Sequence, residues 1–559
     1  MNEGKKICSR RILSAVTWTI IFEILLACAF LAVIHFDFWS PLTWMMDAVT
    51  VLVSPKTWVF FIPVMTCTVS FVYLHGSEFA NVTPYTPNRI SCIQRTLTLH
   101  NGCLALSLLL LSTFSSFFYL SVINERSPSR TGTGGSSVVE ENLYLIVGSV
   151  FVGVYIFITE CILQANALQY PVVQQLRLIQ IKEEFLNLLK QSIIRSISPV
   201  VMFAVLYLIF GSALRNCISN LLSLKIAGNA SFNVMVVFYF YGLTFFYVFA
   251  VTAGKYLLNL HLTERCVFPI VINESNTDKI KLADAMALQQ LPLIQNLAYL
   301  DLKLLAEKDL VRRQQLYILS QPGGHPYNWN GVISECIKLI KSYTEFINLA
   351  CMEMSGEKCG GGVSSQKREI PQLTLPKANS VSMRNLSLVS LNESVQESVS
   401  PLGSNISFSD AIKSYWTQIV DYICKNTVVS YFCGVVPDSR LHWALSQAYP
   451  VIWAAQGLAF ITTASFKEDD YGISLRDLPN IIISLVNLNR AVIKIPKFVV
   501  QKKTRYVEAR SNRMKQALKS ALERSLFKLI ITYDIYLREI KLPVDIFQEL
   551  QNFRNQLEG

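Results

Sequence analysis

The sequence contains none of the short motifs that hold phosphates or carry common enzymatic chemistry. It has no G-x-x-x-x-G-K-[ST], G-x-G-x-x-G, H-E-x-x-H, G-x-S-x-G or D-H-H-C. Its six histidines are isolated from one another, and none of its 13 cysteines forms a C-x-x-C pair. Zinc sites use such ligands at short spacings. We therefore expect no metal, no cofactor and no enzymatic activity.

Charge is also scarce, because only 16% of the residues are charged and 52% are hydrophobic. Six apolar runs are long enough to cross a hydrocarbon core of about 30 Å, which takes roughly 17 to 25 helical residues. Short alternating segments, the mark of a membrane β-barrel, are absent. The sequence predicts an all-α polytopic membrane protein with six transmembrane helices, followed by a mostly helical cytosolic C-terminal region. The expected spans within a domain over residues 1–258 are 14–35, 57–74, 103–123, 143–163, 197–214 and 233–254.

Lys and Arg in the short connections predict the orientation, since these residues are retained on the cytosolic side. Ten lie on the side of the N-terminus: Lys5, Lys6, Arg10, Arg11, Arg89, Arg95, Arg177, Lys182, Lys190 and Arg195. Five lie on the other side: Lys56, Arg126, Arg130, Arg215 and Lys225. Both termini should therefore face the cytosol.

Two acidic residues, Glu23 and Glu160, lie well inside the expected spans. An ionisable residue at membrane depth is a functional candidate by default. An ion or proton pathway would need more such groups and broken helices in two related halves. A transporter or channel that uses Glu23 and Glu160 is thus the alternative to a non-transporting membrane anchor.

The C-terminal half divides by composition. Residues 259–355 form a cytosolic helical segment, in which 285–309 has helical spacing interrupted by Pro292 and 332–350 is amphipathic. Residues 356–409 are rich in serine and glycine and predict a flexible linker. Helical periodicity returns in 410–559, which predicts a C-terminal helical domain. The apolar run 441–466 could be a seventh span, but its polar residues and Pro450 favour two buried core helices.

Residues 502–539 carry ten Lys and Arg against four acids. Most of this stretch reads as one helix, whose expected apolar side comprises Ala517, Leu518, Ala521, Leu522, Leu526, Leu529 and Ile530. A solvated charged face is the simpler interpretation. The sharper one is attraction to anionic headgroups, and it ranks above nucleic-acid binding because no recognised motif accompanies the charge. The candidate membrane-surface residues are Lys502, Lys503, Arg505, Arg510, Arg513 and Lys515.

The most distinctive local sequence is L-S-Q-P-G-G-H-P-Y-N-W at 319–329. Gly-Gly permits a tight turn, His-Pro enforces an extended exit, and Asn328 could cap the next helix. A rigid elbow between two helices is expected, and His325 is favoured as a turn residue over a catalytic one. The motif residues are Gln321, Pro322, Gly323, Gly324, His325, Pro326, Asn328 and Trp329.

With this segment the chain resembles the nuclear division cycle transmembrane nucleoporins, a family of membrane anchors of the nuclear pore complex. The helix that begins Ile333-Ser334-Glu335-Cys336 contributes to the resemblance, as do residues 297–305, His442-Trp443-Ala444 and Ala464-Ser465-Phe466. The layout of six spans, helical segment, serine-rich linker and terminal helical domain extends it over the whole chain.

The resemblance implies a scaffold in the nuclear pore membrane of the nuclear envelope, with both termini facing the cytosol or pore and a C-terminal domain that recruits soluble nucleoporins during pore assembly. The implied partners are the lipid bilayer, the WD-repeat nucleoporin Aladin and the RRM-bearing linker nucleoporin, with no direct nucleic-acid contact. Through the pore, the family serves mRNA and protein transport. The oligomeric state stays open, homo-oligomers included.

Overall fold

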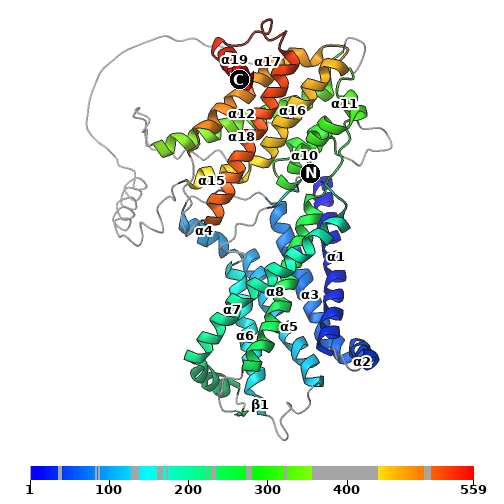
Figure 1. Cartoon of the computed structure of the whole chain (residues 1–559), viewed down its shortest axis with the longest axis vertical. Coiled ribbons are helices and arrows are strands. Elements are labelled where there is room, and N and C mark those ends of the chain that lie inside the picture. Colours follow the sequence, from blue (N-terminus) through cyan, green and yellow to red (C-terminus); the bar gives the residue numbers. More distant parts are fainter. Residues whose placement is uncertain are drawn as a thin grey trace, which may run out of the picture.

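The computed structural model describes residues 2–35, 41–81, 85, 88–126, 137–159, 168–171, 174–222, 225–227, 234–271, 280–319, 324–355, 438–496 and 505–558. Figure 1 shows two parts along the long axis, a bundle of long helices below and a body of shorter helices above. We call them the membrane bundle and the C-terminal body. The N-terminus lies at the boundary between them, so that the first helix begins against the body and runs along the bundle to its far end.

The membrane bundle contains the six helices that are long and apolar enough to cross a bilayer. These are α1 (Asn2–His35), α3 (Pro55–Ala80), α5 (Leu99–Arg126), α6 (Glu140–Ile156), α7 (Arg177–Leu222) and α8 (Val234–Thr263). The short helices α2 (Pro41–Val53) and α4 (Arg89–Thr96) lie at the two ends, and strands β1 (Ser137–Val139) and β2 (Lys225–Ala227) pair in parallel at the end far from the body. The expected fold class is confirmed.

Aromatic side chains fill the centre of the bundle. Phe30 of α1, Phe118 and Tyr119 of α5 and Phe246 of α8 lie with ring centroids 5.2–6.1 Å apart. By contrast, large apolar side chains such as Leu25, Val59 and Leu208 are exposed around the outside. A helix bundle with apolar side chains on both its inner and its outer surface is the pattern that lipid requires, since hydrocarbon solvates the outer face.

The C-terminal body packs helices from both sides of the long undescribed stretch 356–437 into one core. From before it come α9 (Leu282–Ala287), α10 (Pro292–Lys308), α11 (Leu310–Leu316) and α12 (Tyr327–Ser355). From after it come α15 (Ser439–Ser446), α16 (Ala448–Glu468), α17 (Ile473–Lys494), α18 (Arg505–Tyr533) and α19 (Val544–Glu558). Helix α16 packs against α10, α12, α17 and α18, so it is the central helix of this body.

The segment 441–466 forms α15 and most of α16, and the two-helix interpretation is confirmed. The chain turns at Gln447, and Ala454, Leu458 and Ile461 are fully buried among protein neighbours. Pro292 begins α10, as its interruption of the helical spacing suggests. The expected linker 356–409 lies outside the described residues, as does the rest of the stretch up to 437.

One sequence expectation needs correction, and one helix is longer than the span expected within it. Helix α7 begins at Arg177 and contains the expected span 197–214, because the amphipathic stretch in front of the apolar run continues the same helix. Tyr256 and Tyr241 of α8 donate to the carbonyls of Gln180 and Ile193, which places this stretch alongside the bundle. On α18, Ala517 is exposed, and Met514 takes its place on the buried side with Leu518 and Leu522.

A close approach between α10 and α16 generates the first prediction. A Cβ at Gly457 would lie 3.1 Å from Cγ of Leu302, whereas a Cβ at Gly102 of α5 would meet nothing within 4 Å. Gly457→Val should therefore destabilise the protein by about 1–3 kcal/mol through overpacking. Thermal unfolding of the detergent-solubilised protein, followed by tryptophan fluorescence, measures this effect. Gly102→Val is the control, and equal midpoints for the two variants would contradict the packing described.

Candidate docking platform and its junction with the membrane bundle

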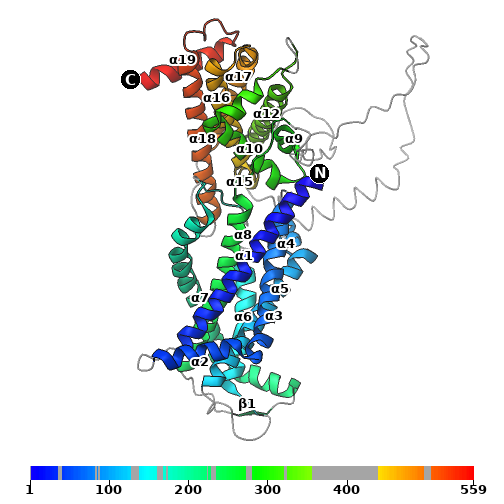
Figure 2. The same cartoon turned by 90° about the vertical axis from the view of Figure 1, so that its right-hand side faces the viewer.

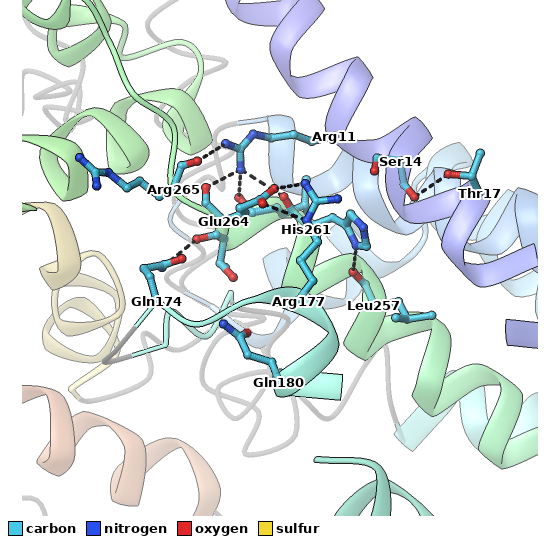
Figure 3. Close-up of polar contacts among 12 residues, drawn as sticks. Arg11, Ser14, Thr17, Gln174, Arg177, Gln180, Leu257, His261, Glu264 and Arg265 are labelled. Atoms are coloured by element: carbon cyan, nitrogen blue, oxygen red, sulfur yellow. Dashed lines mark hydrogen bonds and ion pairs between the residues drawn. The ribbon is translucent and has the colours of Figure 1, made fainter. Parts of the chain in front are cut away.

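The side chain of Arg11 ties the first span to the end of the last one. Its guanidinium donates to the carbonyl oxygens of His261 (3.1 Å), Leu262 (3.2 Å), Glu264 (2.6 Å) and Arg265 (3.3 Å), as Figure 3 shows. The last carbonyls of a helix have no intrahelical partner and carry its negative dipole end. A cation on another helix satisfies them here, and it fixes the direction in which the chain leaves the membrane.

The start of α7 joins the same junction. Arg177 pairs with Glu264 through two hydrogen bonds, Nε to Oε1 at 2.9 Å and Nη2 to Oε2 at 2.5 Å. Before it, Gln169 and Asn259 exchange two hydrogen bonds of 3.0 Å, backbone to side-chain amide. Both side chains of the Arg177–Glu264 pair are more than a third exposed, so the pair adds little to the free energy of unfolding. Its main effect is to fix the start of α7 next to the end of α8. Three helices therefore converge within one turn of the end of α8.

The segment that follows α8 bonds to a buried carboxylate, that of Asp301. Asp301 of α10 is fully buried, accepts from both terminal nitrogens of Arg312 at 3.1 and 2.7 Å, and accepts from the backbone nitrogen of Phe268 at 3.0 Å. Arg312 also donates to the carbonyl of Phe268 at 2.7 Å. Arg265 approaches the same carboxylate at 3.4 Å. The segment 264–271 after α8 is thus bonded to α10 and α11 instead of acting as a free tether.

Two connections at the end of the bundle nearest the body also touch the body. The ring of Tyr170, in the connection before α7, packs edge-on against Tyr449 and Trp453 of α16, with centroids 5.2 and 4.9 Å away. Tyr85, in the connection before α4, shares a 2.8 Å hydrogen bond between hydroxyls with Ser439 of α15. Burial raises the pKa of Tyr170 well above its usual range, so its hydroxyl stays protonated at physiological pH. The body is held to the bundle on several sides.

The elbow expected at 321–329 is held by its aromatic end. Trp329 is buried, packs against Tyr317 with ring centroids 5.6 Å apart, and donates its indole N–H to Oδ2 of Asp477 on α17 at 2.9 Å. Pro326 is buried and His325 is exposed beside Tyr327. Gly324 lies at the edge of the described chain, and Gln321, Pro322 and Gly323 lie outside it.

Asn328 does not cap the following helix, contrary to the sequence expectation. Helix α12 already begins at Tyr327, and the side-chain amide of Asn328 donates instead to the carbonyl of Gln315 at 3.1 Å. That carbonyl lies near the end of α11, where carbonyls lack intrahelical partners. The asparagine therefore joins the end of one helix to the start of the next, which still makes a rigid elbow.

The candidate membrane-surface residues lie on or before the first turns of α18, the end of that helix nearest the bundle (Figures 1 and 2). Arg513 is exposed, and Arg510 is half-buried with its pKa lowered by burial. Lys515 donates to the carbonyl of Ile495 and so caps the end of α17. Lys502, Lys503 and the side chain of Arg505 lie outside the described part of the chain.

Inside the bundle, Glu23 is buried between α1 and α3. Thr68 donates to its Oε1 at 2.7 Å, and the other oxygen has no hydrogen-bond partner in the described residues. Glu160 lies outside them. Among the residues that the structure describes, no three His, Cys, Asp or Glu side chains gather as a metal site would need. Glu23 is thus a buried carboxyl that accepts one hydrogen bond from the described part of the bundle.

Sequence reasoning missed Arg11, Asp301 and Arg312. Arg11 entered only as one of ten charges on the cytosolic side. Asp301 did carry a weak signal, because it lies between the apolar residues Leu300 and Leu302 of an amphipathic helix. A charge at such a position is either an error in the pattern or a buried, paired group. Its partners at 265, 268 and 312 could not be read from spacing.

Comparison with known proteins gives one family across the chain. The sequence pattern of the family described as Nucleoporin protein Ndc1-Nup matches residues 6–551. Human nucleoporin NDC1 is 22% identical over 97% of this chain and 96% of its own length. Nucleoporin Ndc1 of Drosophila melanogaster is 22% identical over 99% and 98%, and nucleoporin ndc-1 of Caenorhabditis briggsae is 24% identical over 49% and 43%.

The junction generates the second prediction. Arg11→Gln removes the charge and most of the four hydrogen bonds, so residues 264–271 should exchange amide hydrogen faster, by a factor of about ten or more for a loss of 1.4 kcal/mol. Hydrogen exchange with mass spectrometry on the detergent-solubilised protein measures it. Arg10→Gln is the matched control, because Arg10 is the exposed neighbour on the same helix. Unchanged exchange in both variants would argue against the junction.

The elbow generates the third. Trp329→Phe keeps the buried ring but leaves Asp477 without its indole donor, which should cost about 1–3 kcal/mol. His325→Ala should be near neutral, because His325 is exposed. Thermal unfolding of the two variants side by side is the measurement. A larger loss for His325→Ala than for Trp329→Phe would show that the elbow is held in another way.

Proposed function

We propose that this chain, which belongs to the Ndc1-Nup family of nucleoporins, anchors the nuclear pore complex in the pore membrane and recruits soluble nucleoporins through its C-terminal body during pore assembly. The chain is a multi-pass transmembrane nucleoporin of the nuclear pore and a structural protein, not an enzyme. The observation that carries the proposal is the rigid mounting of a large helical body on a six-span bundle, through Arg11 and Asp301.

An anchor must transmit force from a protein scaffold to the lipid. A flexible tether between span and platform would let the scaffold drift, whereas buried charge pairs and shared hydrogen bonds resist rotation. The contacts around the end of α8, together with Tyr170 and Tyr85, supply that resistance on several sides. This arrangement favours anchoring over a loose recruiting arm.

We propose that both termini face the cytosol and the pore. An even number of spans returns the chain to its starting side, and the N-terminal end of α1 lies against the C-terminal body in both views (Figures 1 and 2). The excess of Lys and Arg on that side supports the same orientation.

We propose as well a division into a membrane domain over 1–258, a cytosolic helical segment over 259–355, a serine-rich linker over 356–409 and a C-terminal helical domain over 410–559. The family resemblance supports an Aladin-like WD-repeat nucleoporin and the RRM-bearing linker nucleoporin as partners. Lys502, Lys503, Arg505, Arg510 and Arg513 are proposed to face anionic headgroups, while Lys515 has a helix end as its partner.

The orientation is tested by protease protection, which is the fourth prediction. A tag fused after Gly559 should be digested in sealed microsomes without detergent, because the proposed topology leaves it on the cytosolic face. A tag inserted between β1 and α5, on the opposite side of the bundle, is the internal control and should be protected. Protection of the C-terminal tag would overturn the topology and with it the access of soluble nucleoporins to the body.

The transporter alternative is separated by Glu23→Gln, the fifth prediction. Glutamine keeps an oxygen that accepts from Thr68 but cannot ionise, so the bundle should fold as before. An anchor predicts an unchanged rim signal at the nuclear envelope and an unchanged density of pores in cells that depend on the variant. A variant that reaches the rim normally but fails to support pore formation would show that the ionisable carboxyl itself is needed.

A further inference from the structure

The short helix α2 has apolar side chains on two faces, and protein covers only one of them. Val51 and Leu52 pack against the core of the bundle, where α2 contacts α1 and α3. On the other side, Met46 is 66% exposed, Val49 is 50% exposed and Val53 is 71% exposed. Because side chains three and four positions apart share one face of a helix, these residues form a single stripe along the last two turns.

The length and position of α2 place it at the edge of the hydrocarbon core. Its 13 residues make a helix of about 20 Å, which is too short to cross a core of about 30 Å. It follows α1, which ends at His35, and it precedes α3, which begins at Pro55. Figure 2 shows α2 running across the far end of the bundle, whereas α1 and α3 run along the bundle. Helix α2 therefore lies at the depth where two spans reach one membrane surface.

Apolar exposure continues along the chain from α1 through α2 into α3. Val33, in the last turn of α1, is 74% exposed, and Val59, near the start of α3, is 65% exposed. Such side chains on the outside of a membrane bundle are solvated by lipid tails. The stripe on α2 joins these two lipid-facing surfaces, so lipid is the occupant that the neighbouring helices indicate.

The polar groups at the end of α2 are bonded within the protein. Three of its last four carbonyls accept hydrogen bonds from α3 and the turn before it: Thr50 from the nitrogen of Ser54 at 3.0 Å, Val51 from the hydroxyl of Thr57 at 2.5 Å, and Leu52 from the indole N–H of Trp58 at 2.8 Å. Such carbonyls have no intrahelical partner, and leaving them bare is costly in hydrocarbon but not in water. These bonds therefore suit a helix end that lies against lipid.

Two further side chains fit the same surroundings. The hydroxyl of Thr50, which lies beside the exposed stripe, donates to the carbonyl of Met46 at 2.7 Å. A hydroxyl that is bonded to its own helix can enter an apolar medium at little cost. The ring of Trp58 is partly exposed, and indole rings are enriched at the level of the headgroups.

We propose that α2 is an interfacial helix, which lies in the leaflet far from the C-terminal body with Met46, Val49 and Val53 among the acyl chains. A helix in the plane of the membrane binds lipid by burying its apolar face at the boundary of headgroups and chains. Because α2 enters one leaflet only, the protein displaces more lipid in that leaflet than its six spans alone would. The inference goes beyond anchoring, and it holds whichever side of the membrane the body faces.

Fluorescence quenching from two directions tests the occupant of the stripe. An environment-sensitive fluorescent amino acid is placed at Val49 of the full-length protein in lipid nanodiscs, with Val59 as the lipid-facing control and Tyr471 as the water-facing control. Lipids that carry a nitroxide on the acyl chain should quench the probe at Val49 as they quench it at Val59. Iodide should quench it about five-fold or more weakly than at Tyr471, because the acyl region excludes ions.

Each other pattern of quenching overturns the proposal. Quenching by iodide to the same extent as at Tyr471 would show that water covers the stripe. Protection of the probe from both quenchers would show that protein covers it, a second copy of this chain included.

Photo-crosslinking at Val53 keeps the proposal testable if the fluorescent probe disturbs α2. A diazirine amino acid close in size to leucine, placed there in the full-length protein in native membranes, should form adducts with phospholipid that mass spectrometry identifies. The same amino acid at Tyr471 is the control and should form none. Adducts of Val53 with protein, or no adduct at all, would contradict the interfacial position. Those results would leave the anchoring function standing, because the six spans do not depend on α2.

Discussion

The structure depends on how the chain leaves the membrane at the end of α8. The last carbonyls of that helix have no intrahelical partner, and the chain passes there from α8 into the segment 264–271, which has no regular secondary structure. The guanidinium of Arg11, which has only hydrogen-bond donors, bonds to four carbonyl oxygens at once. It thereby pairs the carbonyls at the end of α8 and fixes the direction of the chain after it. Because Arg11 belongs to the first span, the beginning and the end of the membrane domain are closed on each other.

A second constraint on the segment 264–271 is the buried carboxylate of Asp301, which accepts from the backbone nitrogen of Phe268. A buried charge pair is weak evidence for stability by itself, because desolvation offsets much of the attraction. Its effect here is positional: removing one partner would leave an uncompensated charge in the core, so Arg312, Phe268 and Asp301 keep one arrangement. Helix α10 in turn packs against α16, where Gly457 allows a close approach to Leu302. The position of α10 therefore determines the position of α16. The platform is thus positioned relative to the bilayer by a short chain of contacts.

Much of this was predictable from the sequence, and the rest was not, for physical reasons. Apolar runs of bilayer length gave the six spans, and Pro450 with its polar neighbours identified α15 and α16 as core helices, because hydrophobic length and helix breakers act locally. The true start of α7 at Arg177 was missed because an amphipathic helix beside a bundle has no uncharged run. Asn328 bonds to Gln315 and not to its own helix end, a choice made by tertiary contact. Arg11 bonds to Glu264, 253 positions away, and Asp301 bonds to Phe268, 33 positions away, and to Arg312, 11 positions away in another helix; spacing rules within one helix cannot predict such contacts.

Rigid mounting of the platform on the bundle is the central claim, and a distance distribution measures it most directly. Spin labels at two exposed sites, Leu106 in α5 and Tyr471 before α17, would report the separation of bundle and body in the full-length protein in lipid nanodiscs. We predict one narrow distribution for the native chain and a broadened one for Arg11→Gln. A broad distribution in the native chain, unchanged by that substitution, would contradict the account.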